Sequence, residues 1–481
     1  MKRRRIMSDK NKITWGTLAL MAFSTVWGFG NIVNGFVYFN GVQVIFSWLL
    51  MFALYFIPYA LMVGELGSAF KKTGGGVSGW LHETTNAKLA YYAGWTYWAC
   101  HITYIASKSS GGLKALSWAV FRNAKTYDTL PTHMVQIATL VVFLIGCYVA
   151  SRGLNPLKKM LTLAGTTTFV MSLLYIFMML AAPAINPAAE YTHADFSMKG
   201  LIPQFNLGYV TSISILVFAV GGCEKISPYV NKVENPSKGF PKGMIALAGM
   251  VVICAILGTL AMSRMFDPAV INASEESFNN YAAIGSYWAF QKLGQYYHVG
   301  DTFLIIYALC NVVSQFAVLV LSIDAPLRML LENENTQQFI PSALKKTNQY
   351  GVHSNGIKMV VVLSGAIILV QSFVPGAAAV LRQLTKLNSV CMPMRYLWVF
   401  VAYIALRGAI DRIPAEYRFV KNQAVAKFFG GWCFFVTAAS CLLGMYDKNP
   451  FTFALNVITP VILTALGLIL PQIAKREQAE K

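Results

Sequence analysis

Four glycines stand inside two apolar stretches that are long enough to form membrane helices. Gly28 and Gly30 lie in STVWGFGN (24–31), and Gly221 and Gly222 lie in VFAVGGCE (217–224). Glycine costs a helix interior about 1 kcal/mol relative to alanine, so each pair is a candidate unwinding point. Freed amides and carbonyls there become ligands, and the start of a half-helix attracts an anion such as a carboxylate. The alternative is that these glycines allow close helix packing.

The composition indicates which elements must position these glycines. Of 481 residues, 56% are hydrophobic and 12% are charged, whereas soluble domains carry about 25% charged residues. Apolar runs recur from residue 14 to residue 472, with no soluble domain between them. We therefore expect an all-α polytopic membrane protein. The eight cysteines fall within apolar runs and the six histidines are scattered, so we expect neither a metal site nor a cofactor.

Twelve stretches satisfy the requirement of a membrane helix for about 20 largely apolar residues. An even number places both termini on the same side. The segments on that side carry 28 of the 39 lysines and arginines, against eight in the opposite loops, which predicts cytoplasmic termini. We interpret the net charge of +19 as this topology signal and expect no nucleic-acid partner. The twelve stretches are 14–38, 42–64, 87–107, 134–151, 157–182, 205–230, 242–263, 300–323, 357–375, 377–405, 424–445 and 451–471.

The two glycine-bearing stretches are the first and the sixth, so they begin the two halves of a 5+5 inverted repeat. Interrupted segments at corresponding places in two halves are a strong pointer to a transport site. The predicted organisation is a cytoplasmic tail (1–13), a first repeat (14–182), a second repeat (205–405), two further spans (424–471) and a cytoplasmic tail (472–481).

Ionisable residues within the predicted spans are functional candidates by default. Lys386 lies in the tenth stretch, as does Arg382. Lys386 could favour an acidic side chain in the site, or it could lie in a water-filled vestibule. His101 is the only histidine within a predicted span. It could titrate near neutral pH and gate transport, or it could be a histidine that packs in the core with its hydrogen bonds satisfied.

Three blocks of sequence resemble a known family. They are ELGSAFKKTGGGVSGWL (65–81), FAVGGCE (218–224) with VENPSKGFPK (233–242), and APLR (325–328) followed by IP (340–341) and NQYGV (348–352). In this order and spacing they are similar to the amino acid–polyamine–organocation transporters. The GGxE of the sixth stretch is most similar to the bacterial glutamate/GABA antiporter group. The resemblance implies a LeuT-like fold in which helices 1 and 6 are broken.

The resemblance also implies a function and a set of site residues. The substrate would be an amino acid or a related amine, moved by alternating access through a bacterial cytoplasmic membrane by a monomer or a homodimer. Phe218 would be an aromatic gate, and Cys100, His101 and Tyr104 would face the substrate side chain, although core packing could equally explain Phe218, Cys100 and Tyr104. The backbone ligands would be Gly28, Phe29 and Gly30 for the carboxylate, and Gly221 and Gly222 for the amino group.

Several alternatives remain at this point. Exchange competes with cation-coupled or proton-coupled symport. Many relatives carry a lysine in the fifth span that replaces sodium, but LTLAGTTTF (161–169) has none, which weakens lysine-based proton coupling. Sodium would need hydroxyls near the first span, such as Ser314 or Ser322. A membrane enzyme would need a catalytic cluster in the loops and a sensor would need a signalling domain. The sequence favours neither, so we expect no enzyme.

Overall fold

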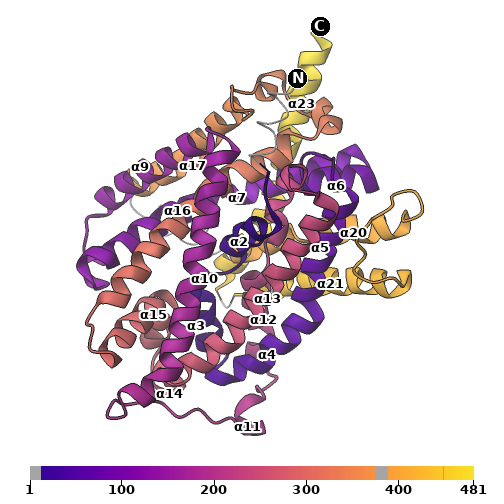
Figure 1. Cartoon of the computed structure of the whole chain (residues 1–481). Coiled ribbons are helices and arrows are strands. Elements are labelled where there is room, and N and C mark those ends of the chain that lie inside the picture. The colour runs from indigo at the N-terminus through magenta and orange to yellow at the C-terminus, as the bar shows by residue number, and fades with distance from the viewer. Residues whose placement is uncertain (1–11, 374–387, 448, 481) are drawn as a thin grey trace.

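A computed structural model describes residues 12–373, 388–447 and 449–480. All named elements within these ranges are helices, and β-structure is limited to two isolated bridges, Ile13 with Val233 and Thr347 with His353. The prediction of an all-α protein is confirmed. Figure 1 shows α10 running along much of the molecule, with α9 beside α17 at one edge and α20 beside α21 at the opposite edge.

Eight helical segments of the described chain are long and apolar enough to cross a membrane, and the bent pair α2 and α3 raises that number to nine. These nine coincide with nine of the twelve predicted spans. They are α2 (Trp15–Val26) with α3 (Phe29–Tyr38), Gly41–Ala69 (η1 Gly41–Gln43, α4 Val44–Met51, η2 Phe52–Phe56, α5 Ile57–Ala69), α9 (Thr132–Ala150), α10 (Leu154–Ile185), α12 (Leu207–Val220) with η3 (Cys223–Lys232), α13 (Pro236–Met262), α16 (Thr302–Leu331), α21 (Gln423–Gly444), and Pro450–Ala479 (α22 Pro450–Ala465, η6 Leu466–Leu468, α23 Ile469–Ala479).

The other three predicted spans differ from expectation. The third corresponds to α7 (Ala87–Phe121), a helix of 35 residues. We expected a loop to begin at 108, which is wrong, because the helix continues through Lys108 and Lys114. The ninth corresponds to α17 (Ser354–Phe373), whose apolar part is shorter. The tenth lies partly outside the described residues, and its described part forms α19 (Asn388–Met394) and α20 (Leu397–Gly408).

Shorter helices lie in the connections between these segments. Figure 1 places α11 and α14 at the end of the molecule opposite α23. The shorter helices are α6 (Val77–Thr84), α8 (Lys125–Asp128), α11 (Met198–Leu201), α14 (Pro268–Ile271), η4 (Glu334–Phe339) and η5 (Ser342–Lys345), and α15 (Glu275–Tyr296) is a longer helix before α16.

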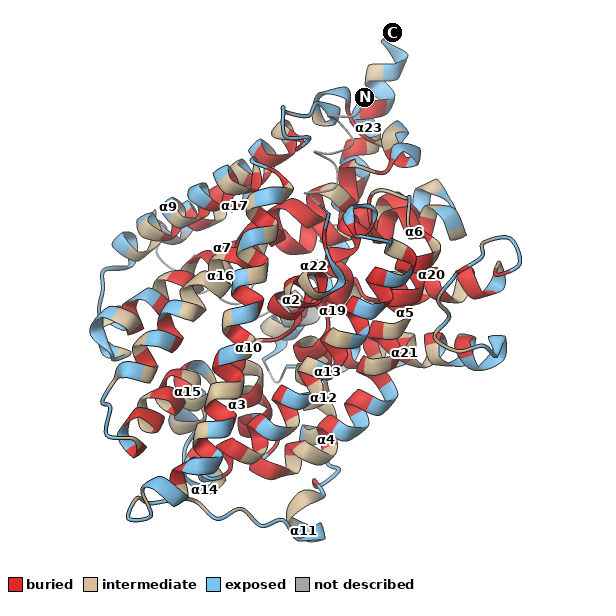
Figure 2. Ribbon diagram, in the orientation of Figure 1, coloured by how far each residue is buried: buried red, intermediate tan, exposed pale blue. Residues whose placement is uncertain are grey.

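The outer surface of the helices is apolar. Large side chains such as Phe177, Val362 and Leu442 are about two-thirds exposed, which would be unfavourable in water but suits lipid. In Figure 2 the buried residues concentrate around α2, α5 and α13, and exposed residues follow the outer faces of α4, α9 and α10. The site must therefore lie among the central helices.

Both glycine-bearing segments lose their α-helical winding at the predicted positions. Helix α2 ends at Val26 and α3 begins at Phe29, with 41° between the two axes. Helix α12 ends at Val220, after which Gly221 is extended and Gly222 has a φ of +104°. The chain continues as a 3₁₀ helix, η3. A positive φ is readily adopted by glycine alone, so Gly222 permits this change of direction.

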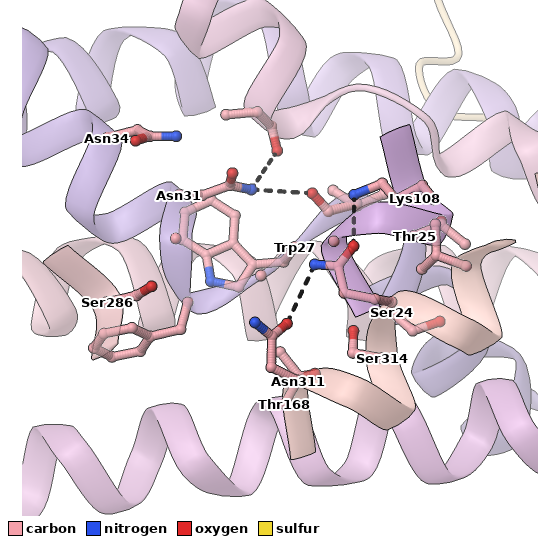
Figure 3. Close-up of a pocket in the computed structure, with 18 of the residues that line it drawn as sticks. Ser24, Thr25, Trp27, Asn31, Asn34, Lys108, Thr168, Ser286, Asn311 and Ser314 are labelled. Carbon is pink, nitrogen blue, oxygen red and sulfur yellow. Dashed lines mark hydrogen bonds between the residues drawn. The ribbon is translucent and has the colours of Figure 1, made fainter. Parts of the chain in front are cut away.

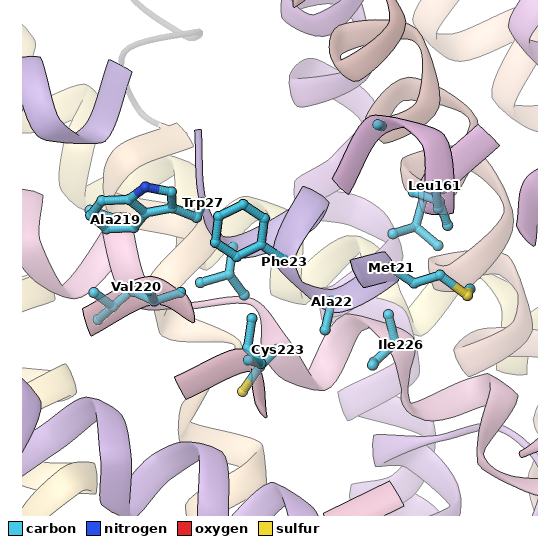
Figure 4. Close-up of a cluster of buried hydrophobic side chains, with 14 of the residues drawn as sticks. Met21, Ala22, Phe23, Trp27, Leu161, Ala219, Val220, Cys223 and Ile226 are labelled. Atoms are coloured by element: carbon cyan, nitrogen blue, oxygen red, sulfur yellow. The ribbon is translucent and has the colours of Figure 1, made fainter. Parts of the chain in front are cut away.

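A buried apolar cluster holds the two interruptions together (Figure 4). Phe23 and Trp27 extend from the end of α2, and Val220 and Ile226 flank the break between α12 and η3. Leu161 of α10 completes the cluster, and all five side chains are buried. Lipid is as apolar as these side chains, so close packing and not the exclusion of water fixes the arrangement.

Candidate substrate-binding cavity

A cavity of about 410 Å³ lies between the two helix breaks. Its walls come from α2, α3, α7, α10, α12, η3, α15 and α16, and from residues 392–396. A volume of this size falls in the range of small-molecule sites. Seven residues predicted for the site line it: Gly28, Phe29, Gly30, Tyr104, Phe218, Gly221 and Gly222.

The first break presents its backbone to the cavity. A Cβ atom added to Gly28 or Gly30 would meet no other atom within 4 Å. The ring of Phe29 packs against Phe290 and Tyr175, at centroid distances of 4.7 and 4.8 Å. The first amides of α3 have no acceptor one turn earlier in their own helix, and they stand at the positive end of its dipole. This geometry suits a carboxylate.

Two other predicted site residues do not line the cavity, and a third lies outside the described residues. Cys100 is buried, and its Sγ lies 3.5 Å from the carbonyl oxygen of Cys391. His101 is fully buried and contacts Arg395 behind the cavity wall. Lys386, like Arg382, lies outside the described residues. Functional roles for Cys100 and Lys386 stay predictions.

Asn31 connects the two breaks and was not predicted as a site residue. Its Nδ2 donates to the carbonyl of Val26 at 3.3 Å and to the carbonyl of Ala219 at 3.1 Å (Figure 3). These carbonyls lie at the ends of α2 and α12, where no further helical turn can supply an amide. A polar residue directly after the Gly-Phe-Gly run was the available signal.

A polar stripe on α7 forms another wall of the cavity. Tyr104, Lys108, Gly111 and Lys114 all line it, and their spacing of three or four residues places them on one helical face. Placing the end of the third span at 107 separated Lys108 from Tyr104, although their spacing of four could have joined them.

The Lys108 ammonium begins a chain of hydrogen bonds along the cavity. It donates to Gln315 Oε1 at 3.2 Å, and Gln315 Nε2 donates to Asn311 Oδ1 at 3.2 Å, as Figure 3 shows. Asn311 then donates to the hydroxyl of Tyr287 at 2.9 Å. These hydrogen bonds fix the orientation of each amide and hold the Lys108 ammonium against this wall of the cavity.

Lys225 corrects our topology count. We counted it among the charges of the cytoplasmic side, but it is buried in η3 and lines the cavity. Its ammonium donates to Ser322 Oγ at 2.7 Å and lies 5.2 Å from the ring centroid of Tyr104. Ser322 donates in turn to the carbonyl of Val318. Of the two serines considered as sodium ligands, Ser322 therefore already contacts a cation, and Ser314 lines the cavity.

Arg395 supplies a further buried cation. Its Nη1 lies 2.8 Å from His101 Nε2, and its guanidinium packs over the rings of Tyr97 and Tyr396 at 5.1 and 5.3 Å. Its Nε lies 3.6 Å from Glu224 Oε1. The sequence placed Arg395 inside the tenth span without a partner, because the contacts that hold it come from distant segments.

The cavity lining is strongly cationic. Four basic side chains contribute, and among the described lining residues there is no aspartate or glutamate. The nearby carboxylate of Glu224 is buried behind Arg395 and accepts a hydrogen bond from the Tyr59 hydroxyl. Clefts lined by one sign of charge concentrate ligands of the opposite sign. The cavity thus suits an anion. The four basic residues are Lys108, Lys114, Lys225 and Arg395.

Comparison with known proteins agrees with this geometry. The chain is 46% identical over 481 residues to the aspartate/glutamate permease AcaP of Lactococcus lactis subsp. cremoris (strain MG1363), covering 98% of this chain and 97% of AcaP. It is 24% identical to the inner membrane transporter YjeM of Escherichia coli (strain K12), over 82% of each chain. It is 26% identical to a probable agmatine/putrescine antiporter, AguD, of Lactococcus lactis subsp. lactis (strain IL1403), over 45% of this chain and 44% of AguD.

The family model "amino acid permease" matches residues 13–466. Together with the apolar helices, this match shows a multi-pass membrane protein that transports and does not catalyse a reaction. The resemblance inferred from residues 65–81, 218–242 and 325–352 is confirmed. The chain belongs to the amino acid permease family.

Proposed function

We propose that this permease transports acidic amino acids, aspartate and glutamate, by alternating access through the cavity between the two helix breaks. The observation that supports the proposal is the cavity lining, which carries four basic side chains and, among the described residues, no carboxylate. The 46% identity to a protein named as an aspartate/glutamate permease supports the same substrates.

The charges of the substrate and of the cavity complement each other. An acidic amino acid carries two carboxylates and one ammonium. The α-carboxylate would bind the free amides at Phe29 and Gly30, and the ammonium would bind backbone carbonyls at the ends of α2 and α12. The side-chain carboxylate would face Arg395 and Lys225. A buried charge without a partner is costly. The side-chain carboxylate of the substrate would neutralise part of the positive charge of the cavity, whereas a neutral substrate would leave that charge unpaired.

A cationic amine is the competing substrate class, because a relative carries the name of an agmatine/putrescine antiporter. That similarity covers less than half of either chain. A dication would also have to enter beside Lys225, Arg395 and Lys108. Like charges at close range destabilise such a complex. The lining therefore favours the dicarboxylate.

The membrane topology belongs to the same proposal. We infer twelve spans in a LeuT-like 5+5 inverted repeat, with both termini in the cytoplasm. Two features support it: the interruptions at 27–28 and 221–222 lie in the first and sixth predicted spans, and most lysines and arginines fall in the segments assigned to the cytoplasmic side. Cysteine labelling from either side of the membrane at positions 122–131, after α7, and 409–422, after α20, tests the orientation.

Uptake into liposomes tests the function. The purified protein should take up labelled aspartate and glutamate, with asparagine, GABA and agmatine as poorer substrates. Agmatine uptake faster than aspartate uptake would contradict the proposal. Preloading the liposomes with unlabelled aspartate separates exchange from symport, since an obligate exchanger requires internal substrate, whereas a symporter also takes up aspartate into empty liposomes when an ion gradient drives it. Two pH values and the presence or absence of sodium identify the coupling ion.

A charge-neutralising variant links uptake to the cavity. Lys225→Gln retains a polar side chain that can contact Ser322, but it removes one cation. We expect a KM for aspartate about tenfold higher, as for the loss of a hydrogen bond to a charged group. The matched control is Lys232→Gln, seven residues later at the end of η3 and exposed. Equal effects of the two variants would remove Lys225 from the site.

A further inference from the structure

Arg395 and Glu224 form an incomplete ion pair in the centre of the molecule. Their nearest charged atoms, Nε and Oε1, are 3.6 Å apart. Both atoms are buried, and neither has a hydrogen-bond partner in the described structure. Buried opposite charges normally approach to about 2.8 Å and share a hydrogen bond. Other contacts must therefore hold the two groups apart.

Arg395 Nη1 is held mainly by His101, with a weaker contact of 3.7 Å to Met392 Sδ. Arg395 Nη1 lies 2.8 Å from Nε2 and 3.3 Å from Nδ1 of the imidazole. His101 Nδ1 lies 2.6 Å from the carbonyl oxygen of Tyr97. A carbonyl oxygen only accepts, so Nδ1 carries a proton. A guanidinium only donates, so Nε2 carries none. His101 is therefore a neutral acceptor for Arg395.

The restraint on Glu224 comes from Tyr59, whose hydroxyl donates to Oε2. Glu224 is thereby held toward α5, while His101 draws Arg395 toward α7. Arg395 Nη2 lies 3.9 Å from the point where a Cβ atom of Gly222 would stand. Gly222 lines the cavity, so the guanidinium presents this nitrogen toward the substrate.

We propose that His101 is a positioning residue that keeps Arg395 from closing onto Glu224 and so leaves the guanidinium available to the side-chain carboxylate of the substrate. The inference rests on the proposed function, since it assigns a role in the recognition of an acidic substrate. It replaces the two earlier hypotheses for His101, a pH-sensing gate and a passive packing residue. Without His101, Glu224 and the substrate compete for the same cation.

Transport kinetics of the full-length protein in liposomes test the inference. His101→Leu removes the acceptor, and we expect the KM for aspartate to rise about tenfold, as for the loss of a hydrogen bond to a charged group. The KM for asparagine should change little, because asparagine has no second carboxylate. His101→Gln keeps an acceptor oxygen and should retain the KM of the unmodified protein for aspartate. His353→Gln is the matched control, since its Nδ1 also lies near a backbone carbonyl, that of Leu344, away from the cavity.

The competition predicts a rescue. In the double variant His101→Leu with Glu224→Gln, the competing charge is removed, and the KM for aspartate should return most of the way to that of the unmodified protein. The inference is overturned if His101→Leu leaves the aspartate KM unchanged, if both KM values rise equally, or if the second substitution gives no recovery. Should His101→Leu fail to fold, Glu224→Gln alone decides, because a lower aspartate KM would support competition and an unchanged or raised one would contradict it.

Failure of the inference can be distinguished from failure of the proposed function. If the unmodified protein takes up neither aspartate nor glutamate, both are wrong. If it takes up aspartate and His101→Leu does so with the same KM, only the positioning role is wrong.

Discussion

The two helix breaks use glycine for different physical reasons. At the first break, a Cβ atom on Gly28 or Gly30 would face empty space. At the second, a Cβ atom on Gly221 would lie 2.2 Å from Cε2 of Tyr396, and Gly222 has a left-handed backbone. The first pair therefore leaves room for a ligand, whereas the second pair lets the chain turn and pack against a neighbouring aromatic ring.

The two segments look alike in the sequence, but the glycines of the first serve substrate binding, whereas those of the second serve folding. Substitutions at the first break should leave a folded protein with an altered site. Substitutions at the second should damage the fold before they affect the site. Four variants test whether the two breaks differ in this way, in descending order of expected effect.

Gly221→Ala should have the largest effect. The added methyl group would overlap the ring of Tyr396, and overpacking of this kind costs about 1–3 kcal/mol or more. We expect poor yield and a clearly lower Tm in detergent. Adding Tyr396→Leu should recover part of the yield by removing the ring. A normal Tm for the single variant would contradict the packing role of Gly221.

Gly30→Leu should abolish transport without loss of the folded protein. Leucine is favoured over glycine in a helix by about 1 kcal/mol, and its Cβ meets no neighbour within 4 Å, but its bulk would fill the space beside the first amides of α3. The measurements are Tm and aspartate uptake, with Gly30→Ala as the smaller matched change. Uptake at the rate of the unmodified protein would remove Gly30 from the binding site.

Asn31→Ala should weaken the connection between the breaks. Two hydrogen bonds are lost, to Val26 and to Ala219, each worth about 1 kcal/mol. We expect a moderate fall in both Tm and the maximal uptake rate. Asn34→Ala is the control, because Asn34 lines the same cavity but bonds to neither carbonyl. Equal losses of Tm and uptake rate in the two variants would show that the two hydrogen bonds of Asn31 contribute nothing beyond the effect of a polar lining residue.

Gly28→Ala should have the smallest effect. Gly28 has φ −133° and ψ 156°, which any residue adopts, and a Cβ atom there has no neighbour within 4 Å. We expect a Tm at or slightly above that of the unmodified protein and an aspartate KM within about twofold, as for glycine substitutions at compatible sites. A large loss of stability would mean that the first break, like the second, needs glycine for its backbone.

The sequence alone predicted the parts of the site that depend on the conformational preference of individual residues. Glycine in the middle of an apolar helix is unfavourable, but this cost alone does not locate a break, because Gly430 and Gly431 lie within the unbroken α21. The interruptions were located because the two glycine pairs also occupy corresponding places in the first and the sixth predicted spans. The helical class of the fold follows from the length of the apolar runs.

Residues defined by distant contacts could not be located in this way. Lys225 was counted among the charges of the cytoplasmic side, because charge near the end of a span usually marks topology. Only the packing of η3 against α16 shows that its ammonium reaches Ser322. Arg395 was left unassigned for the same reason, since its partners come from α7 and η3. Lys108 was the avoidable omission, because it follows Tyr104 by one helical turn.

Thermal stability in the presence of candidate ligands shows whether the charge of the cavity selects an acidic amino acid. A ligand that binds only the folded protein raises Tm, by an amount that grows with its concentration. Aspartate should raise the Tm of the purified protein, asparagine should raise it less, and agmatine should leave it unchanged. A rise in Tm with agmatine that equals or exceeds the rise with aspartate would contradict the account.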